Sequence, residues 1–545
     1  MFTNLINRPS HQTTPPKKAL LANVLLLLVY AAIVCFTAAH HEPWCDEADP
    51  WLLARDENFA GIMARMNYVG SSALWYLLLV PFAKAGLPYI AMTAVNVVIV
   101  FLALALLVFR APFSFWLKAT VCFSYLFVYE YPVLARSYGL SALLIMSLAA
   151  TYQYGKKHPL LYGLLIALLA NTNVHGLIVA MGITAAFLFT KWRNGLTALA
   201  PVAVAAVGII LSILQVLPPA DGQFPPKLNY DFWSHPVLNT FKGPFFPDPY
   251  TSLDHWVSEP FFGGSISLIF KLLAFAIIFL LIRKLWPHRF ALFTFLLSYA
   301  GLFFLFAFKY YGSVRHWGFY ILVALYCLWI QADDENVAEK SGIVGEAGAT
   351  ANSEVASKAG ATANSEVASK ASPSTTSETP DETTSDGKRS KLTARFDSAL
   401  SILLLVSFTY SAGVGLYACV TEVERPFSSG LEMAAELSHR NIENVPVVCN
   451  PNVGLSVLPY LPTLKFYYPN LHEFGTHALW NRAEKQVLTT EQLCQIVDEK
   501  FGKQKILLLT DKEDPGLLKD GFTLVYRNQV APITSSENLV LYSRN

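Results

Sequence analysis

The sequence predicts a polytopic α-helical membrane protein with a small C-terminal α/β domain. Of its 545 residues, 54% are hydrophobic and only 14% are charged, whereas an ordinary soluble protein has about 25% charged residues. Up to residue 420, the chain contains a series of apolar runs that approach the roughly 20 residues needed to span a bilayer. The remainder, 421–545, alternates helical and strand patterns, which is typical of a helix-flanked sheet.

About eleven apolar runs are long enough to count as transmembrane helices. The first, 19–39, follows Lys17 and Lys18, which keep the N-terminal tail 1–18 cytoplasmic. This run is longer than the apolar region of a signal peptide, so we expect a retained anchor. The other runs lie near 89–109, 114–129, 137–154, 159–173, 175–190, 196–217, 263–282, 290–308, 317–331 and 397–419.

The segment 72–86 decides the orientation of every later span. Its apolar part is about half as long as a membrane crossing, so we expect an interfacial helix within a first external loop, 40–88. The basic residues between spans then fall on the side of Lys17 and Lys18, as the positive-inside rule requires. They are Arg110, Lys118, Lys156, Lys157, Lys191, Arg193, Arg283, Lys284 and the stretch 388–395.

Three further parts of the chain follow from this topology. The multi-span membrane domain covers 19–331 and includes a long external loop, 218–262, rich in proline and aromatic residues. Residues 332–396 contain two copies of Gly-Ala-Thr-Ala-Asn-Ser-Glu-Val-Ala-Ser-Lys-Ala, and such low complexity predicts a disordered cytoplasmic linker. The last span, 397–420, leads back to the external side.

The external domain 421–545 is expected to contain a sheet flanked by helices. Helices are predicted at 429–440, 453–460 and 490–501, and strands at 445–449, 464–468, 504–510, 522–527 and 538–542. Cys449 and Cys494 both lie in this domain. A disulfide between them is left open.

The first external loop begins with an acidic and aromatic stretch, His40 to Trp51. Carboxylates just after a helix are commonly solvated caps, and we assign that role to its flanks, Glu42, Asp49, Asp56 and Glu57. Asp46 and Glu47 stand between two tryptophans, and partial burial raises the pKa of a carboxylate towards that of a working base. Both a structural ion pair and a catalytic base fit these two residues.

Two polar groups lie at the start of later spans on the same predicted surface. Glu130 and Arg136 fit an ion pair that caps helix ends, and Arg136 also fits a phosphate contact. His175 follows a short polar turn, where an interhelical hydrogen bond is the simpler interpretation.

A third group, Lys309, Arg315 and His316, places basic residues on the external side against the usual bias. Long basic side chains there fit contacts with lipid headgroups. They equally fit the phosphate of a lipid-linked donor.

Several classes of function lack their sequence signals. The chain has no glycine-rich phosphate loop, no His-Glu-x-x-His and no Cys-x-x-Cys, so nucleotide binding and a dedicated zinc site have no support. It has no basic stripe interleaved with aromatic residues, which argues against nucleic acid as a partner.

Together, these residues resemble the C-type glycosyltransferases, membrane enzymes that use polyprenyl-phosphate sugars. That superfamily includes the protein O-mannosyltransferases and the aminoarabinose and galacturonic acid transferases that act on lipopolysaccharide. The resemblance covers roughly 19–331 and is carried by Asp46-Glu47, Ala73-Leu74-Trp75-Tyr76-Leu77-Leu78, Ala135-Arg136-Ser137-Tyr138, His175 and Arg315-His316. Many relatives have His-Pro at the start of the interfacial helix, where this chain has Gly70-Ser71-Ser72.

The resemblance implies the C-type glycosyltransferase fold and an inverting sugar transfer at the outer face of a bacterial cytoplasmic membrane. The donor would be a polyprenyl-phosphate sugar, and the acceptor a glycan, lipid or protein. Asp46 would be the base, with Glu47 as a substitute or an orienting neighbour. Cations can stabilise the leaving phosphate without a metal, although a divalent metal is left open. Donor-phosphate contacts would come from Arg136, Lys309, Arg315 and His316, and the pocket would include Trp75, Glu130, Tyr138 and His175.

Two other functions compete with sugar transfer. A lipid or solute transporter needs charged residues at the membrane midplane, and the centres of the predicted spans are nearly free of them. A non-catalytic subunit of envelope polysaccharide biosynthesis would tolerate loss of Asp46. The placement of the polar groups on one side of the membrane favours sugar transfer.

Overall fold

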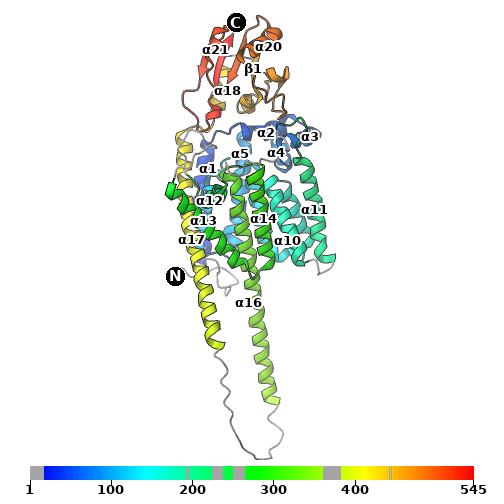
Figure 1. Cartoon of the computed structure of the whole chain (residues 1–545), viewed down its shortest axis with the longest axis vertical. Coiled ribbons are helices and arrows are strands. Elements are labelled where there is room, and N and C mark those ends of the chain that lie inside the picture. The colour runs from blue at the N-terminus through cyan, green and yellow to red at the C-terminus, as the bar shows by residue number, and fades with distance from the viewer. Residues whose placement is uncertain are drawn as a thin grey trace, which may run out of the picture.

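The computed structural model describes residues 17–191, 196–223, 237–248, 264–359, 382–440, 442 and 445–544. The N-terminal tail before residue 17, Arg193 and most of the predicted loop 218–262 lie outside these residues. Figure 1 shows a helical bundle with a small sheet domain at one end and two long helices leaving the other end. The predicted helical membrane protein with a small C-terminal α/β domain is confirmed.

Within the described residues, six helices are long and apolar enough to cross a membrane. The segments that meet this criterion are Lys17–His40, Ile90–Arg110, Leu199–Val216, Gly264–Leu285, Arg289–Phe308 and Ala394–Glu424. Shorter apolar helices cover Leu74–Lys84, Ser137–Ala150, Pro159–Ala170 and Val174–Thr190. The protein is therefore a multi-pass membrane protein.

The bundle is built from helices that follow the predicted apolar runs. They are α1 (Lys17–His40), α5 (Ile90–Arg110), α6 (Phe115–Phe123), α7 (Ser137–Ala150), α8 (Tyr152–Gly155), α9 (Pro159–Ala170), α10 (Val174–Lys191), α11 (Leu196–Val216), α13 (Gly264–Leu285), α14 (Arg289–Phe308), α16 (Phe319–Ala359) and α17 (Glu382–Glu424). Among them, α5 packs on α7, α9 on α11, and α10 on α14. Because side chains face neighbouring helices and lipid alike, most of these helices are apolar all round.

A layer of short helices covers the end of the bundle next to the sheet domain (Figure 1). It consists of α2 (Cys45–Asp56), α3 (Phe59–Val69) and α4 (Leu74–Lys84), and α4 packs directly on α2. The predicted helix at 72–86 is therefore short and lies at this end. The acidic stretch, which the sequence suggested only as a loop, is largely the helix α2.

The predicted span 114–129 is broken in the structure. Helix α6 ends at Phe123, where Ser124 adopts an extended conformation, and a turn of π-helix, η1 (Leu126–Glu130), follows. The chain from Tyr125 to Ala135 is buried inside the bundle. This buried segment delivers Arg136 to the N-terminus of α7.

Two further short helices belong to the bundle. Helix α12 (Leu238–Phe245) lies within the predicted loop 218–262 and packs against α13 and α15. Helix α15 (Val314–Trp317) precedes α16 and carries Arg315 and His316.

The C-terminal domain contains one six-stranded sheet in the order β3-β2-β1-β4-β6-β5. Strands β2, β1 and β4 run parallel, and the other neighbours pair antiparallel. The strands are β1 (Val447–Cys449), β2 (Phe466–Tyr468), β3 (Glu473–Gly475), β4 (Ile506–Thr510), β5 (Thr523–Arg527) and β6 (Val540–Arg544), and the helices are α18 (Gly430–His439), α19 (Pro451–Gly454), α20 (Thr490–Phe501) and α21 (Pro515–Lys519). The five predicted strands are confirmed, whereas β3 and α21 were not predicted.

The two faces of the sheet belong to different cores. Val447 and Cys449 join the large core that continues into the membrane bundle, whereas Val448 faces a smaller core under α20 with Cys494. All seven cysteines are free. A bridge between Cys449 and Cys494 is not formed, because their side chains lie on opposite faces of the sheet.

The predicted disordered linker is helical at both ends. Helix α16 continues to Ala359, and α17 begins at Glu382; Figure 1 shows both leaving the bundle opposite the sheet domain. The repeat is rich in alanine with glutamate and lysine and has no proline before Pro373, so its residues favour a helix. Residues 360–381 lie outside the described residues.

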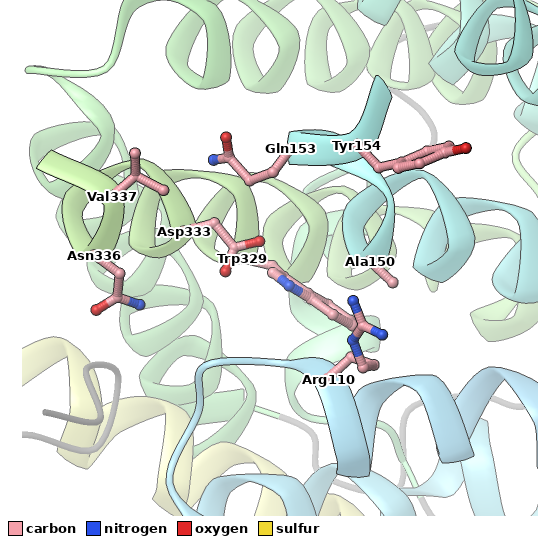
Figure 2. Close-up of a pocket in the computed structure, with 8 residues that line it drawn as sticks. All are labelled: Arg110, Ala150, Gln153, Tyr154, Trp329, Asp333, Asn336 and Val337. Carbon is pink, nitrogen blue, oxygen red and sulfur yellow. The ribbon is translucent and has the colours of Figure 1, made fainter. Parts of the chain in front are cut away.

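The end of the bundle where α16 leaves carries its own polar cluster. Asp334 accepts hydrogen bonds from Gln153, Lys156 and His288 at 2.5–2.7 Å. Beside it is a cavity of about 310 Å³, into which Figure 2 shows Arg110, Trp329 and Asp333 converging from α5 and α16. At 1.5 Å per residue, Asp334 lies about 22 Å along α16 from Phe319, the first residue of that helix.

Candidate active site

A cavity of about 550 Å³ opens between the bundle, the α2–α4 layer and the C-terminal domain. Its wall includes most of the residues that the sequence singled out: Asp46, Arg136, Tyr138, His175, Lys309, Arg315 and His316. These residues come from α2, α7, α10, the end of α14, and α15. Glu47, Glu130 and Trp75 are buried nearby but do not line it.

Asp46 lies at the charged part of the cavity, in the first turn of α2. Its carboxylate is 3.0 Å from Nη1 of Arg136 and 3.4 Å from Nη2 of Arg315. Arg136 also donates to the backbone carbonyl of Asp46. The structure therefore pairs Arg136 with Asp46 rather than with Glu130, which accepts a hydrogen bond from Tyr125 at 2.5 Å.

Glu47, the neighbour of Asp46, belongs to a fully buried network instead. One carboxylate oxygen accepts the Ala135 N–H at 2.5 Å, and the other is 2.9 Å from Nε2 of His41. The other ring nitrogen of His41 is 2.9 Å from Glu422 of α17, which also accepts from Tyr129 at 2.5 Å. Both oxygens of Glu47 are occupied away from the cavity, so of its two predicted roles, substitute base or orienting neighbour, these contacts fit the orienting one.

His41 carries the positive charge of this network. Burial alone lowers the pKa of His41, but the carboxylates of Glu47 and Glu422 more than reverse this effect and raise it to about 10. The imidazolium therefore ties the start of α2, and with it Asp46, to the last membrane helix.

His316 takes a single tautomer. Its Nδ1 lies 2.9 Å from the backbone N–H of Ser313, which can only donate, so this nitrogen is an acceptor. The proton is therefore on Nε2, which donates to the hydroxyl of Tyr138 at 2.8 Å. Burial, followed by the charge of Arg315, also lowers the pKa of His316 well below its usual value. The neutral imidazole that this environment favours could contact the predicted phosphate as a hydrogen-bond partner rather than as a cation.

The hydroxyl of Tyr138 accepts from His316, so its own proton is available to a ligand in the cavity. We expect Tyr138→Phe to lower kcat/KM for the substrate of this candidate active site by about tenfold, the cost of one neutral hydrogen bond. Steady-state kinetics on the full chain would check this, with Tyr154→Phe, an exposed tyrosine at the opposite end of the bundle, as the control. Equal losses in both variants would contradict the assignment.

The part of the cavity around His175 is aromatic. The His175 ring lies 5.0 Å from His316, 5.2 Å from Phe319 and 5.6 Å from Phe306, measured between centroids. Among the residues that the structure describes, neither ring nitrogen of His175 has a hydrogen-bond partner. Because a buried polar group without a partner is costly, this imidazole is suited to a polar ligand.

The cavity wall also includes Asp49 and Trp480, to which the sequence interpretation gave no role in the site. Asp49, assigned there as a solvated flank, is only 2% exposed and accepts a hydrogen bond from Nε1 of Trp480 at 3.0 Å. Burial raises the pKa of Asp49 to about 7, although the bond from Trp480 and the charge of Arg136 oppose this. In a helix, residues three positions apart, such as Asp46 and Asp49, lie on the same face. The sequence analysis did not predict a helix here, so it did not place them together.

Glu42 was also assigned as a solvated flank, and this assignment was wrong. It is partly buried and accepts the Leu431 N–H of the C-terminal domain at 2.6 Å. Burial raises the pKa of Glu42 to about 7. It thus helps to attach that domain to the segment between α1 and α2.

No group of three or more His, Cys, Asp or Glu side chains among the described residues is arranged to hold a metal ion.

The chain is similar to two crystal structures of ArnT from Cupriavidus metallidurans, one in the apo state and one bound to undecaprenyl phosphate. The sequence identity is 12% in both cases, and the alignment covers 95% of this chain and 97% of the other. The TM-scores are 0.48 for the apo structure and 0.49 for the lipid-bound one. No family model and no curated protein matches the chain.

Proposed function

We propose that the protein is an inverting glycosyltransferase that moves a sugar from a polyprenyl-phosphate donor to an acceptor at the outer face of a bacterial cytoplasmic membrane. The observation that carries this proposal is the charge of the cavity. Three cations, Arg136, Lys309 and Arg315, face two carboxylates, Asp46 and Asp49. The surplus positive charge fits a phosphodiester, which carries one negative charge.

The two arginines would exchange partners when the donor binds. In the empty cavity, Asp46 is the counterion of Arg136 and Arg315, which keeps both guanidinium groups in place. A phosphate, like a carboxylate, offers two oxygens that can accept paired hydrogen bonds from one guanidinium group. Arginines already in position then stabilise the charge that grows on the phosphate as the bond to the sugar breaks.

The remaining lining supports a sugar beside this phosphate. Tyr138 offers a hydroxyl donor, and His175 offers an imidazole among aromatic rings. Aromatic faces suit the apolar faces of a sugar ring, while hydroxyl and imidazole groups suit its hydroxyls.

Transfer of a labelled sugar tests this proposal. Membranes containing the full chain would receive a panel of undecaprenyl-phosphate sugars with a radiolabelled sugar, and label in envelope glycan, lipid and protein would be counted. We expect transfer by the wild type and an approximately 100-fold loss in Arg315→Ala. Arg55→Ala should keep the activity, because Arg55 bonds to Asp56 and to the Leu458 carbonyl outside the cavity.

Two results would contradict the proposal. If no donor in the panel is consumed, the chain is not a transferase for these lipids. If label crosses sealed vesicles without becoming attached to an acceptor, the chain is a transporter.

A further inference from the structure

One side chain of the cavity comes from the C-terminal domain, Trp480. Its backbone has a φ of 55°, in the left-handed region that bulky residues rarely adopt. Two hydrogen bonds hold it there: the Trp480 N–H donates to the buried Glu484 at 2.5 Å, and the Trp480 carbonyl accepts from the N–H of Gln223, after α11, at 3.0 Å. Strain of this kind persists only where the surroundings enforce it, and it commonly marks a functional position.

The indole of Trp480 is fixed as well. Its Nε1 donates to one carboxylate oxygen of Asp49, which joins the C-terminal domain to α2 inside the cavity wall. The two side chains form one unit, which we call the Asp49–Trp480 pair. It brings an aromatic face and a carboxylate together at a single place.

The two carboxylates of α2 differ in what they can do. Asp46 contacts Arg136 and Arg315, the two cations proposed to bind the donor phosphate. Asp49 contacts Trp480, a neutral donor, and burial keeps the pKa of Asp49 at about 7, which is suited to a general base. The charged and titratable groups that act on Asp49 are Asp46 of the same helix, Arg136 of α7, Tyr76 of α4 and Glu484 of the C-terminal domain.

Resting on the proposed function, we propose that the Asp49–Trp480 pair is the acceptor subsite and that Asp49 is the general base. The acceptor hydroxyl gives its proton to Asp49 as its oxygen bonds to the anomeric carbon. The bond from that carbon to the phosphate oxygen breaks, and its electron pair remains on the phosphate beside Arg136 and Arg315. The proton therefore ends on Asp49, and the new negative charge ends on the phosphate.

The chemistry of the pair indicates a carbohydrate acceptor. An indole face packs well against the C–H groups on one side of a sugar ring, and a carboxylate accepts from its hydroxyls. We therefore expect the acceptor to be a glycan or the sugar part of a glycolipid. Transfer of label to a protein side chain with no sugar attached would overturn this part of the proposal.

The pH dependence of transfer by four variants tests the pair, with the undecaprenyl-phosphate sugar that gave the highest wild-type activity. Activity of the wild type should rise with pH through about 7, because Asp49 acts as its carboxylate. Asp49→Asn should lose about 100-fold or more in kcat, and Asp49→Glu should recover part of that loss. Asp56→Asn, an exposed aspartate of the same helix, is the matched control.

Trp480 separates the two roles within the pair. Trp480→Phe keeps an aromatic face but removes the N–H that lowers the pKa of Asp49, so the pH profile should move to higher pH. Trp480→Ala should also raise KM for the acceptor. All variants should still bind undecaprenyl phosphate, which shows that they are folded and that the donor end is intact.

The outcomes distinguish this inference from the proposed function. Wild-type transfer together with an unchanged rate and pH profile in Asp49→Asn would overturn the inference alone. A wild type that neither transfers sugar nor binds undecaprenyl phosphate would overturn the proposed function and the inference with it.

Discussion

Replacing Arg136 with alanine is expected to reduce the rate of sugar transfer by about 100- to 1,000-fold. Arg136 is the cation closest to Asp46, and it contacts both the carboxylate and the backbone carbonyl of that residue. Its removal takes away a charge that is in place before the phosphate begins to leave. The measurement is kcat/KM with the labelled donor, on the full chain in membranes.

Two further variants test whether the loss of activity is specific to the guanidinium group of Arg136. Arg136→Lys should recover only part of the activity, because an ammonium group lacks the planar two-point contact of guanidinium. Arg110→Ala removes an arginine that lines a different cavity (Figure 2) and should leave the rate unchanged. An Arg136→Ala variant as active as Arg110→Ala would contradict the assignment.

Replacing His41 with alanine is expected to lower the free energy of unfolding by about 3–5 kcal/mol. The substitution would leave the carboxylates of Glu47 and Glu422 buried without the imidazolium that lies between them. Thermal unfolding in detergent would measure the loss. His40→Ala is the matched control, because His40 is adjacent and exposed, and its ring bonds to the Phe36 carbonyl of its own helix.

The same histidine gives the stability a defined pH dependence. The pKa of His41 in the folded chain, about 10, is above its ordinary value of 6.5. Its contribution is therefore complete below pH 6.5 and is lost as the pH rises through 10. The difference in melting temperature between wild type and His41→Ala should shrink over that range, and a difference that grows would contradict the charged network.

The sequence was most informative where one physical property dominates. Apolar length predicted the membrane helices, because a span must be apolar over its whole length. Helix α20 was predicted with its observed bounds, Thr490–Phe501, because an amphipathic stretch there ends at Gly502. The predicted topology placed Asp46, Arg136 and Arg315 on the same side of the membrane, and these three side chains line one cavity.

The sequence was less informative where the assignment depends on which way a side chain faces. Asp46, Glu47 and Asp49 are nearly adjacent, yet Asp46 and Asp49 face the cavity whereas Glu47 faces His41. That distinction follows from the direction in which each residue of α2 points. The sequence did not predict this helix, which contains a proline, Pro50. The contact between Trp480 and Asp49 could not be predicted, because the two residues are 431 positions apart in the sequence.

The affinity of the purified full-length chain for undecaprenyl phosphate tests the central claim most directly. The protein would be placed in lipid nanodiscs, and undecaprenol, which has the same chain without the phosphate, would serve as the matched ligand. We predict that the wild type binds undecaprenyl phosphate far more tightly than undecaprenol, and that the double variant Arg136→Ala/Arg315→Ala loses this preference. Equal affinity of the wild type for the two lipids would contradict a phosphate site in the cavity.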